Sequence, residues 1–244
     1  MEQRQARSEQ APRADRILAA AGELLLRFGY QRVTIDDIAA RAEVGKGTVY
    51  LHWKTKHELF AVLLLREVAE VMRELLADMR ADPAQALLHR VMRASFLAIM
   101  RRPLTRALYT RDIDTLGKLL AGDAAGLAAR QRVTDALFDD YLDLMRGHGL
   151  LRVDIDRQTQ VYVLNAVGAG FYATEQFLPE QLREMSLEHK AAALAEVIRL
   201  AFEPPGEPDP GTLRAVAPRA IELYERMRAE CDPGATTAPP ETQE

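Results

Sequence analysis

Apolar side chains recur at helical spacing along most of this 244-residue chain, and no segment of useful length alternates polar and apolar residues as a strand does. The first apolar stripe begins near Ala14 and ends at Phe28, where Gly29 is suited to end the helix. Residues that cap helices well precede later stripes, at Thr34, Thr55, Asp156 and Ser186. The pattern therefore predicts an all-α protein.

The hydrophobic pattern also divides the chain into a small head and a larger body. The helix that Thr55 caps keeps one apolar stripe to about Arg80, and we expect it to connect the two parts. A Pro-rich stretch at 203–210 interrupts the later helices. We expect a disordered arm at 1–13, a three-helix head at 14–60, a helical-bundle body at 61–203, a linker with one more helix at 204–230, and a disordered tail at 231–244.

Charge is unevenly distributed between these parts. Residues 1–60 contain 10 Lys/Arg and 8 Asp/Glu, whereas the remainder contains 22 and 28, for a net charge of −4. A basic head on an acidic body confines attraction for phosphate to one end. Because no run of about 18 apolar residues occurs, no membrane span is expected. The N-terminus has no apolar signal region, and the single cysteine, Cys231, allows no internal disulfide, so we expect a cytoplasmic protein.

Residues 34–60 have the pattern of a short helix, a tight turn and a second short helix. The second helix carries small, hydroxyl, aromatic and basic side chains, which suit contacts with DNA. Gly47 lets a phosphate approach the backbone closely, and Thr48 can donate to a phosphate or touch a thymine methyl group. Further phosphate contacts are expected from Tyr50, His52 and Lys54.

The motifs TIDDIA at 34–39 and KGTVY at 46–50, followed by HWK at 52–54 and by Lys56, resemble those of the TetR family of tetracycline-repressor-like regulators. The resemblance covers about a quarter of the chain, from Ala14 to Phe60. It implies a homodimeric transcriptional regulator, a repressor that a small molecule releases from a double-stranded DNA operator. It also implies that the following side chains face DNA: Thr34, Lys46, Thr48, Tyr50, His52 and Lys54.

Three residues depart from the family pattern. Glu43 stands where glycine is common in the turn, and a left-handed backbone there would cost about 1 kcal/mol. Gly45 replaces a hydroxyl N-cap, and Trp53, which we assign to the core, replaces phenylalanine. For Lys56, a DNA contact and a place on a solvated face are about equally favoured interpretations. The arginines of the arm could enter a minor groove, although a solvated tail is the favoured interpretation.

The helices that follow Asp156 and Ser186 are the candidates for a dimer interface, by their position in the resembled family and by composition. Two glycines inside the first of them suggest a close approach of helices, because glycine destabilises a helix interior by about 1 kcal/mol. Packing within one chain, or space for a ligand, is the alternative. The candidate interface residues are Gly168, Gly170, Phe171, Leu194 and Ile198.

The body should hold a pocket for a small amphipathic or apolar effector, with apolar walls and a few polar groups. The inward candidates are Phe96, Met100, Tyr109, Phe138, Tyr141, Met145, Tyr162, Asn165 and Tyr172. For each of them a place in the core is the alternative interpretation. Arginines and aspartates between Arg101 and Asp114 could bind an anion or gate the pocket, although a solvated charged corner is favoured.

Other classes of protein fit the sequence less well. The chain has no phosphate loop, no nucleophile elbow and no HExxH pair, and its five histidines are scattered, so we expect no enzyme, metal or cofactor. A helical adaptor that does not bind DNA remains an alternative. A DNA-binding regulator without a ligand, or one that activates transcription, is another.

Overall fold

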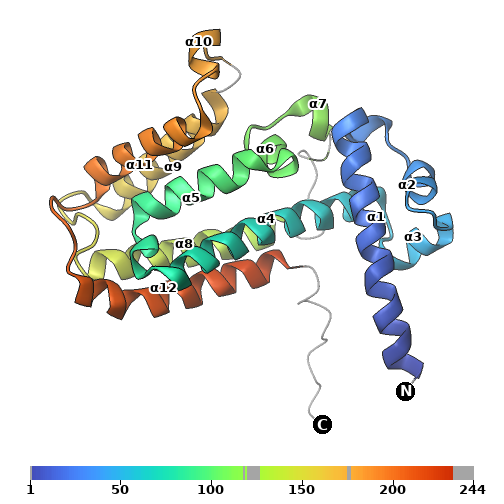
Figure 1. Ribbon diagram of the computed structural model, residues 1–244, viewed down its shortest axis with the longest axis horizontal. Coiled ribbons are helices and arrows are strands. Elements are labelled where there is room, and N and C mark those ends of the chain that lie inside the picture. Colours follow the sequence, from blue (N-terminus) through green and yellow to red (C-terminus); the bar gives the residue numbers. More distant parts are fainter. Residues whose placement is uncertain (1, 118, 120–126, 175–176, 233–244) are drawn as a thin grey trace.

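The structure is a computed structural model that describes residues 2–117, 119, 127–174 and 177–232. In this part of the chain every regular element is a helix (Figure 1). The prediction of an all-α fold is confirmed. Among the described helices, none is long and apolar enough to cross a membrane. Figure 1 shows the head at the right-hand end, with the body extending away from it to the left.

The head comprises α1 (Glu2–Arg32), α2 (Ile35–Arg41) and α3 (Lys46–His52), closed by the first turns of α4 (Lys56–Ala81). These helices share one apolar core because each turns its apolar stripe toward the others. The most deeply buried members are Ile17, Ala21, Leu25, Ile38, Val49, Leu59 and Phe60. Helix α4 then leaves the head and enters the body, as the uninterrupted stripe after Thr55 indicated.

Helix α1 begins at Glu2, so residues 2–13 of the expected disordered arm belong to a helix instead. This segment is rich in Gln, Arg, Ala and Glu, whose side chains lose little freedom in a helix and therefore favour it. At the other end, Gly29 has φ 75° and ψ 157°, outside the helical region. The regular helix is interrupted where the sequence indicated its end.

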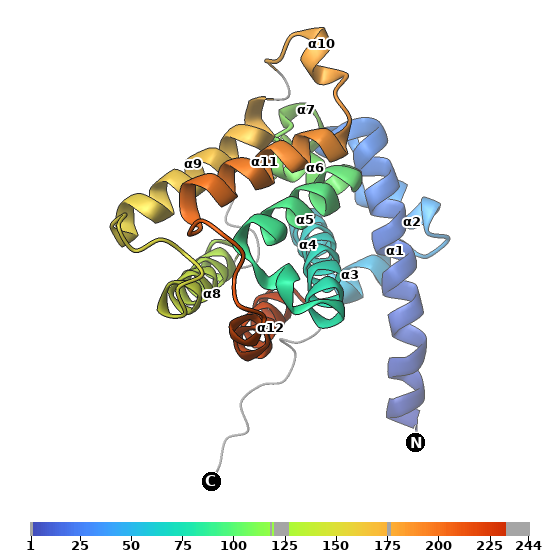
Figure 2. The same ribbon diagram turned by 60° about the vertical axis from the view of Figure 1, so that its left-hand side comes forward.

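The body follows α4 along the chain. Its elements are η1 (Pro83–Ala86), α5 (Leu88–Arg101), α6 (Pro103–Tyr109), α7 (Ile113–Leu116), α8 (Leu127–Gly147), α9 (Arg157–Ala173), α10 (Glu180–Arg183), α11 (Leu187–Phe202) and α12 (Pro210–Cys231). Helix α5 packs on α4 and, on another side, on α11, which lies beside α9 (Figure 2). The two short helices α6 and α7 lie against α1 and so join the body to the head.

The expected helix caps are confirmed. Each hydroxyl or carboxylate side chain accepts a hydrogen bond from the backbone N–H three residues further on, which satisfies a donor that the helix leaves unpaired. These caps are Thr34, Thr55, Asp156 and Ser186.

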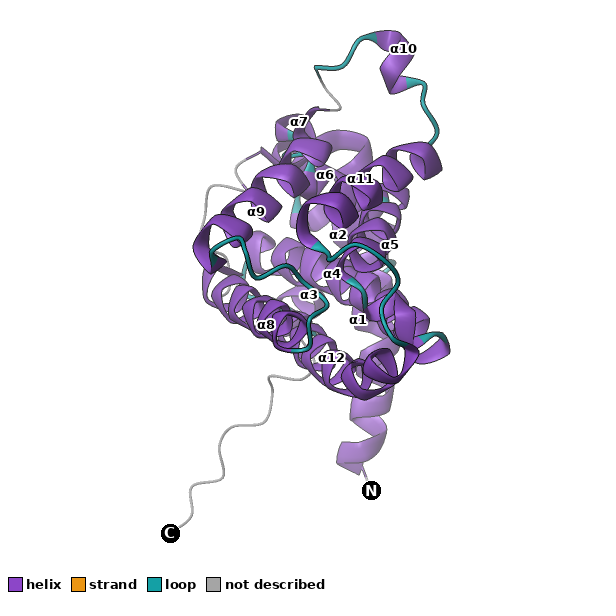
Figure 3. Cartoon of the chain, turned by 90° about the vertical axis from the view of Figure 1, so that its left-hand side faces the viewer, coloured by secondary structure: helices purple, strands orange, loops and turns teal. Residues whose placement is uncertain are grey.

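The C-terminal helix α12 is part of the core of the body and not an appendage to it. It packs against α4 and α8 and runs alongside α8 (Figure 3). The ring of Tyr224 on α12 meets that of Tyr141 on α8 edge to face, at 5.5 Å between centroids. Cys231, which we expected in a disordered tail, is the last residue of α12 and is buried. Residues 233–244 of that tail lie outside the described part of the chain.

The place of α12 in the core predicts that its apolar face stabilises the whole body. Leu223 is 2% exposed, so Leu223→Ala should lower the free energy of unfolding by about 2–5 kcal/mol. Urea denaturation followed by circular dichroism measures the change, and Arg214→Ala, at an exposed position of the same helix, is the control. A change below about 0.5 kcal/mol for Leu223→Ala would show that α12 is dispensable for stability.

Candidate nucleic-acid interface

Helix α2 is fixed at its start by reciprocal hydrogen bonds between Thr34 and Asp37. The backbone N–H of Asp37 donates to Thr34 Oγ1 at 3.2 Å, and the backbone N–H of Thr34 donates to Asp37 Oδ2 at 2.8 Å. The Thr34 hydroxyl group also donates to Asp37 Oδ2, at 2.6 Å. This bond, followed by the one from the Thr34 N–H, lowers the pKa of the Asp37 carboxyl group from its ordinary value. Ile35, Ile38 and Ala39 point into the head core, so α2 supports the helix that follows it.

The turn after α2 contains the backbone strain that the sequence indicated. Glu43 has φ 55°, in the left-handed region that favours glycine. Its N–H donates to the carbonyl of Ala40 at 3.2 Å, and that of Val44 donates to the carbonyl of Ala39 at 3.0 Å. This pair of bonds forms a Schellman motif with glutamate at its left-handed position. The turn keeps its geometry although its side chain is unfavourable.

Two buried side chains anchor α3, which has only seven residues. Val49 is fully buried, and Trp53, directly after the helix, is 6% exposed. The assignment of Trp53 to the core is confirmed. Because these residues are four apart, one side of α3 is held against the head and the opposite side must face outward.

The predicted DNA-facing residues lie on and around this outward side. Thr34, Lys46, Gly47, Tyr50 and Lys54 are exposed, and two others, Thr48 and His52, are half-buried. A Cβ added to Gly47 would meet nothing within 4 Å, so the packing of the described chain does not itself require glycine there. Space remains outside the helix for another molecule to approach the backbone.

Lys46 and Lys56 differ in their surroundings. Lys46 Nζ donates to Asp36 Oδ2 at 2.8 Å, and this bond raises the pKa of Lys46 above its ordinary value. An approaching phosphate would replace Asp36 as the partner of Lys46. Lys56 instead lies over the ring of Tyr30, 4.3 Å from its centroid, and burial lowers its pKa. Lys56 therefore contributes to the packing of the head.

Leu51 is an exposed residue that the sequence analysis did not identify. It is 83% exposed, the largest exposure among the described large hydrophobic side chains. The signal was available in its position: Leu51 lies two residues from each of the buried Val49 and Trp53, on the opposite side of α3. An apolar side chain there can contact a thymine methyl group in the major groove.

The candidate pocket residues mostly form the core of the body. Phe96, Tyr141 and Met145 are buried, and the ring of Phe96 packs against that of Tyr172 at 5.4 Å. Phe138 is half-buried against Tyr141, whereas Tyr109, 38% exposed, packs against Tyr172. Of the nine candidates, Met100 and Tyr172 line a cavity of about 890 Å³ among the described residues.

For two of the candidate pocket residues, the prediction that they point inward was wrong. Tyr162 is 73% exposed, and Asn165 is exposed, with its amide donating at 2.9 Å to the carbonyl of Val161 in the same helix. Asn165 thus uses a partner one turn away and needs none across the body. Both residues lie on the outer side of α9, because that helix is buried through Gln160, Leu164 and Gly168.

The candidate dimer residues are also placed differently from the expectation. Leu194 and Ile198 are fully buried in the core of the body, since α11 turns this stripe toward α5. They cannot lie on an outer surface, and that part of the prediction was wrong. Gly168 is buried next to Met92, Phe171 is half-buried against Phe96, and Gly170 has nothing within 4 Å of an added Cβ.

Comparisons with known proteins agree on one family. A family model described as bacterial regulatory proteins, tetR family, matches residues 17–63, which span α2, α3 and parts of α1 and α4. An HTH-type transcriptional regulator, MT2310, of Mycobacterium tuberculosis (strain CDC 1551 / Oshkosh) is 31% identical over 134 residues, which cover 51% of this chain and 70% of the relative. The DNA-binding transcriptional repressor TetR of Mycobacteroides abscessus is 29% identical over 151 residues, 60% of this chain and 74% of its own.

Similarity to solved structures extends over the body. SmeT is the repressor of the multidrug efflux pump SmeDEF of Stenotrophomonas maltophilia. Its complex with triclosan matches this fold with a TM-score of 0.61 and 26% identity, covering 83% of this chain and 97% of SmeT. The head and the helical body therefore occur together in a known regulator.

The left-handed glutamate generates a prediction about stability. Glu43→Gly should raise the free energy of unfolding by about 1 kcal/mol, because glycine adopts a positive φ without the steric clash. Ala40→Gly, at an exposed position inside α2, is the matched control and should lower it by about 1 kcal/mol. Thermal unfolding of both variants measures the difference. Equal destabilisation by the two glycines would contradict the role given to Glu43.

Proposed function

The chain belongs to the tetR family of bacterial regulatory proteins, and we propose that it is a dimeric repressor that a small molecule releases from its operator. It is a DNA-binding transcriptional regulator rather than an enzyme. The single observation that carries the proposal is the outward face of α3, which offers Lys46, Tyr50 and Leu51 while Val49 and Trp53 hold the helix in place. Because the proposed operator lies on the chromosome, we also propose that the protein acts in the cytoplasm.

The proposed DNA contacts use three kinds of chemistry. Lys46 and Lys54 supply charge for phosphates, and Tyr50, 46% exposed, supplies a hydroxyl donor. Leu51 and Thr48 are the side chains best placed to touch base edges. Phosphate contacts fix the position of α3 in the groove, and the few base contacts select the sequence.

A dimer is supported by the small size of the head and by an exposed apolar face on α9 and α11. One helix of seven residues makes few contacts, and specific operators are normally read by two such helices. Tyr162 on α9 and Val197 and Leu200 on α11 are 73%, 42% and 62% exposed. We propose that these side chains, with the neighbouring alanines of α11, pack against a second copy of the chain.

Release by an effector requires that a change in the body reaches the head, and contacts of α6 provide a route. Leu104 on α6 belongs to the head core, and a Cβ added to Gly22 of α1 would lie 3.3 Å from Leu104 Cδ1. A movement of α6 would therefore displace α1. SmeT, which has a similar fold, forms a complex with the small molecule triclosan.

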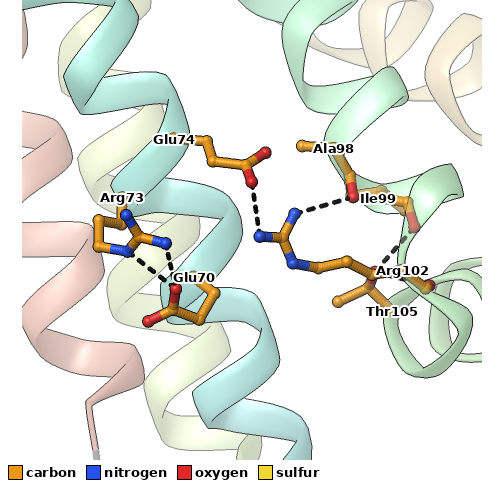
Figure 4. Close-up of polar contacts among 7 residues, drawn as sticks. All are labelled: Glu70, Arg73, Glu74, Ala98, Ile99, Arg102 and Thr105. Atoms are coloured by element: carbon orange, nitrogen blue, oxygen red, sulfur yellow. Dashed lines mark hydrogen bonds and ion pairs between the residues drawn. The ribbon is translucent and has the colours of Figure 1, made fainter.

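A second contact links the junction of α5 and α6 to α4 (Figure 4). Arg102 Nη2 donates to Glu74 Oε1 at 2.6 Å, and this bond lowers the pKa of the Glu74 carboxyl group. The fully buried Thr105 donates to the carbonyl oxygens of Ile99, at 2.8 Å, and Arg102, at 3.1 Å. The bend between the two helices is thus held together and tied to the helix that leads to the head.

The α3 surface generates the test of DNA binding. Tyr50→Ala and Lys54→Ala should each weaken binding to duplex DNA from upstream of the protein's own gene, because each removes a phosphate contact. Lys54→Ala should also reduce the slope of log affinity against log salt concentration by about 1. Fluorescence anisotropy over a range of salt concentrations measures both effects.

Arg214→Ala on the distant α12 is the control for these variants and should leave the affinity unchanged, and circular dichroism should report an intact fold for all three. Binding that does not depend on salt, or that survives both substitutions in the head, would contradict the assignment of α3.

The exposed face of α9 and α11 generates a separate prediction. The double variant Val197→Glu and Leu200→Glu should convert a dimer to a monomer, because the substitutions would place four charges in one apolar interface. Its affinity for DNA should fall as the two heads separate. Analytical ultracentrifugation measures the mass, and Val133→Glu, at an exposed apolar position on α8, is the matched control. If the double variant assembles as fully as the unaltered chain, the interface lies elsewhere.

A further inference from the structure

The cavity of about 890 Å³ lies where the end of α1, the short helices α6 and α7, the end of α9 and the start of α11 come together. One part of its lining is apolar: Leu26, Met100, Tyr172, Met185 and Leu187. Another part carries guanidinium groups: Arg106, Arg111 and Arg183. A cavity with these two kinds of wall suits a molecule with an apolar part and a charged end.

The charge of the lining favours an anion. Within the described part of the chain, the side chains of Arg106, Arg111 and Arg183 make no hydrogen bond or ion pair, whereas Arg101 and Arg102 nearby are paired with glutamates. Of the two aspartates at the cavity, Asp112 already accepts two hydrogen bonds from Thr115, at 3.0 Å from its N–H and 2.8 Å from its hydroxyl group. The lining therefore carries four cationic side chains, Arg106, Arg111, Arg183 and Lys190, against the two carboxylates of Asp112 and Asp114.

The backbone at Arg111, which lines the cavity, has an unfavourable conformation. Arg111 has φ 54°, so it stands in the left-handed region where glycine would fit without a clash. The N–H of Arg111 donates to Leu108 at 3.3 Å and that of Asp112 to Ala107 at 2.9 Å, which is the Schellman pattern. The geometry of the turn does not require arginine at position 111, where glycine would be less strained. A role of the Arg111 side chain in the adjacent cavity would explain why arginine occupies this position.

We propose that this cavity binds a small amphipathic monoanion, a carboxylate on an apolar chain or ring. The guanidinium groups of Arg106, Arg111 and Arg183 hold the carboxylate through charge-assisted hydrogen bonds. The apolar part lies against Met100 and Tyr172, which are 5% and 8% exposed. The proposal that the cavity binds this anion depends only on the residues that line it. The proposal that binding regulates DNA affinity rests on the function proposed above.

The position of the cavity gives binding a direct effect on the head. Asp114, in α7 beside Arg111, is in contact with the end of α1: a Cβ added to Gly29 would lie 2.6 Å from the carbonyl oxygen of Asp114. This contact leaves no free space between α7 and α1. A carboxylate that draws the arginines together would shift α7, and α1 would have to move with it.

Binding is tested by titration calorimetry of the full chain with decanoate, kept below its micelle concentration. Decan-1-ol and decyltrimethylammonium supply the same apolar chain with no charge and with a positive charge. Decanoate should bind with one site per chain, and the other two should bind at least about tenfold more weakly, because neither can accept from guanidinium groups as a carboxylate does. Equal binding of all three, or preference for the cation, would overturn the proposal.

Arg111→Gly separates a binding role from a structural one. The variant should raise the melting temperature without decanoate, because the strained turn is relieved, and yet weaken decanoate binding about tenfold. Glu43→Gly, the equivalent change in the strained turn of the head, is the matched control and should leave decanoate binding unchanged. Unchanged decanoate affinity in Arg111→Gly would exclude the cavity as the site.

The effect on DNA is measured separately, by anisotropy of duplex DNA with and without decanoate. A lower affinity for DNA supports both the site and release by an effector. If decanoate binding depends on Arg111 but DNA affinity does not change, the binding site is supported and the release of DNA by a ligand in this cavity is refuted. If the chain binds decanoate but no duplex DNA, the proposed function fails and the cavity assignment survives.

Discussion

The structure depends on the burial of Val49 and Trp53 at the two ends of one helical turn. Helix α3 is too short to be stable alone, and without a side-chain cap on Gly45 it relies on this packing. Because the two anchors share one side, the residues between them are turned outward, where DNA can reach them. Stability of the head and exposure of its proposed reading surface thus have the same cause.

Helix α4 connects the packing of the head to the packing of the body. Its first turns bury Leu59 and Phe60 in the head core, and its later turns bury Leu75 and Met79 in the body core. A single continuous helix therefore belongs to both cores. Together with α6 and α7, which pack on α1, it means that the head cannot change its orientation without repacking in the body.

Local sequence signals predicted the parts of the fold that local chemistry determines. The four capping residues, the break at Gly29 and the left-handed strain at Glu43 follow from side-chain chemistry within a few residues, and the structure contains each of them. The buried Trp53 could be predicted because helical spacing pairs it with Val49.

The directions of side chains in the body could not be predicted in the same way. Helices α9 and α11 carry alanine, glycine and branched apolar residues around most of their circumference, so periodicity alone does not identify the inner face. Leu194 and Ile198 turned out to be core, and Tyr162 and Asn165 to be surface. The arginine-lined cavity depends on segments distant in sequence, which only the tertiary structure brings together.

The most direct test of the central claim, that α3 is held rigidly as a reading surface and used in pairs, is selection of bound duplexes from a pool of random sequence by the purified chain. The account predicts enrichment of an inverted repeat, with half-sites separated by about one helical turn of DNA or a multiple of it. Recovery of sequences with no common motif, or of a motif without two-fold symmetry, would contradict it.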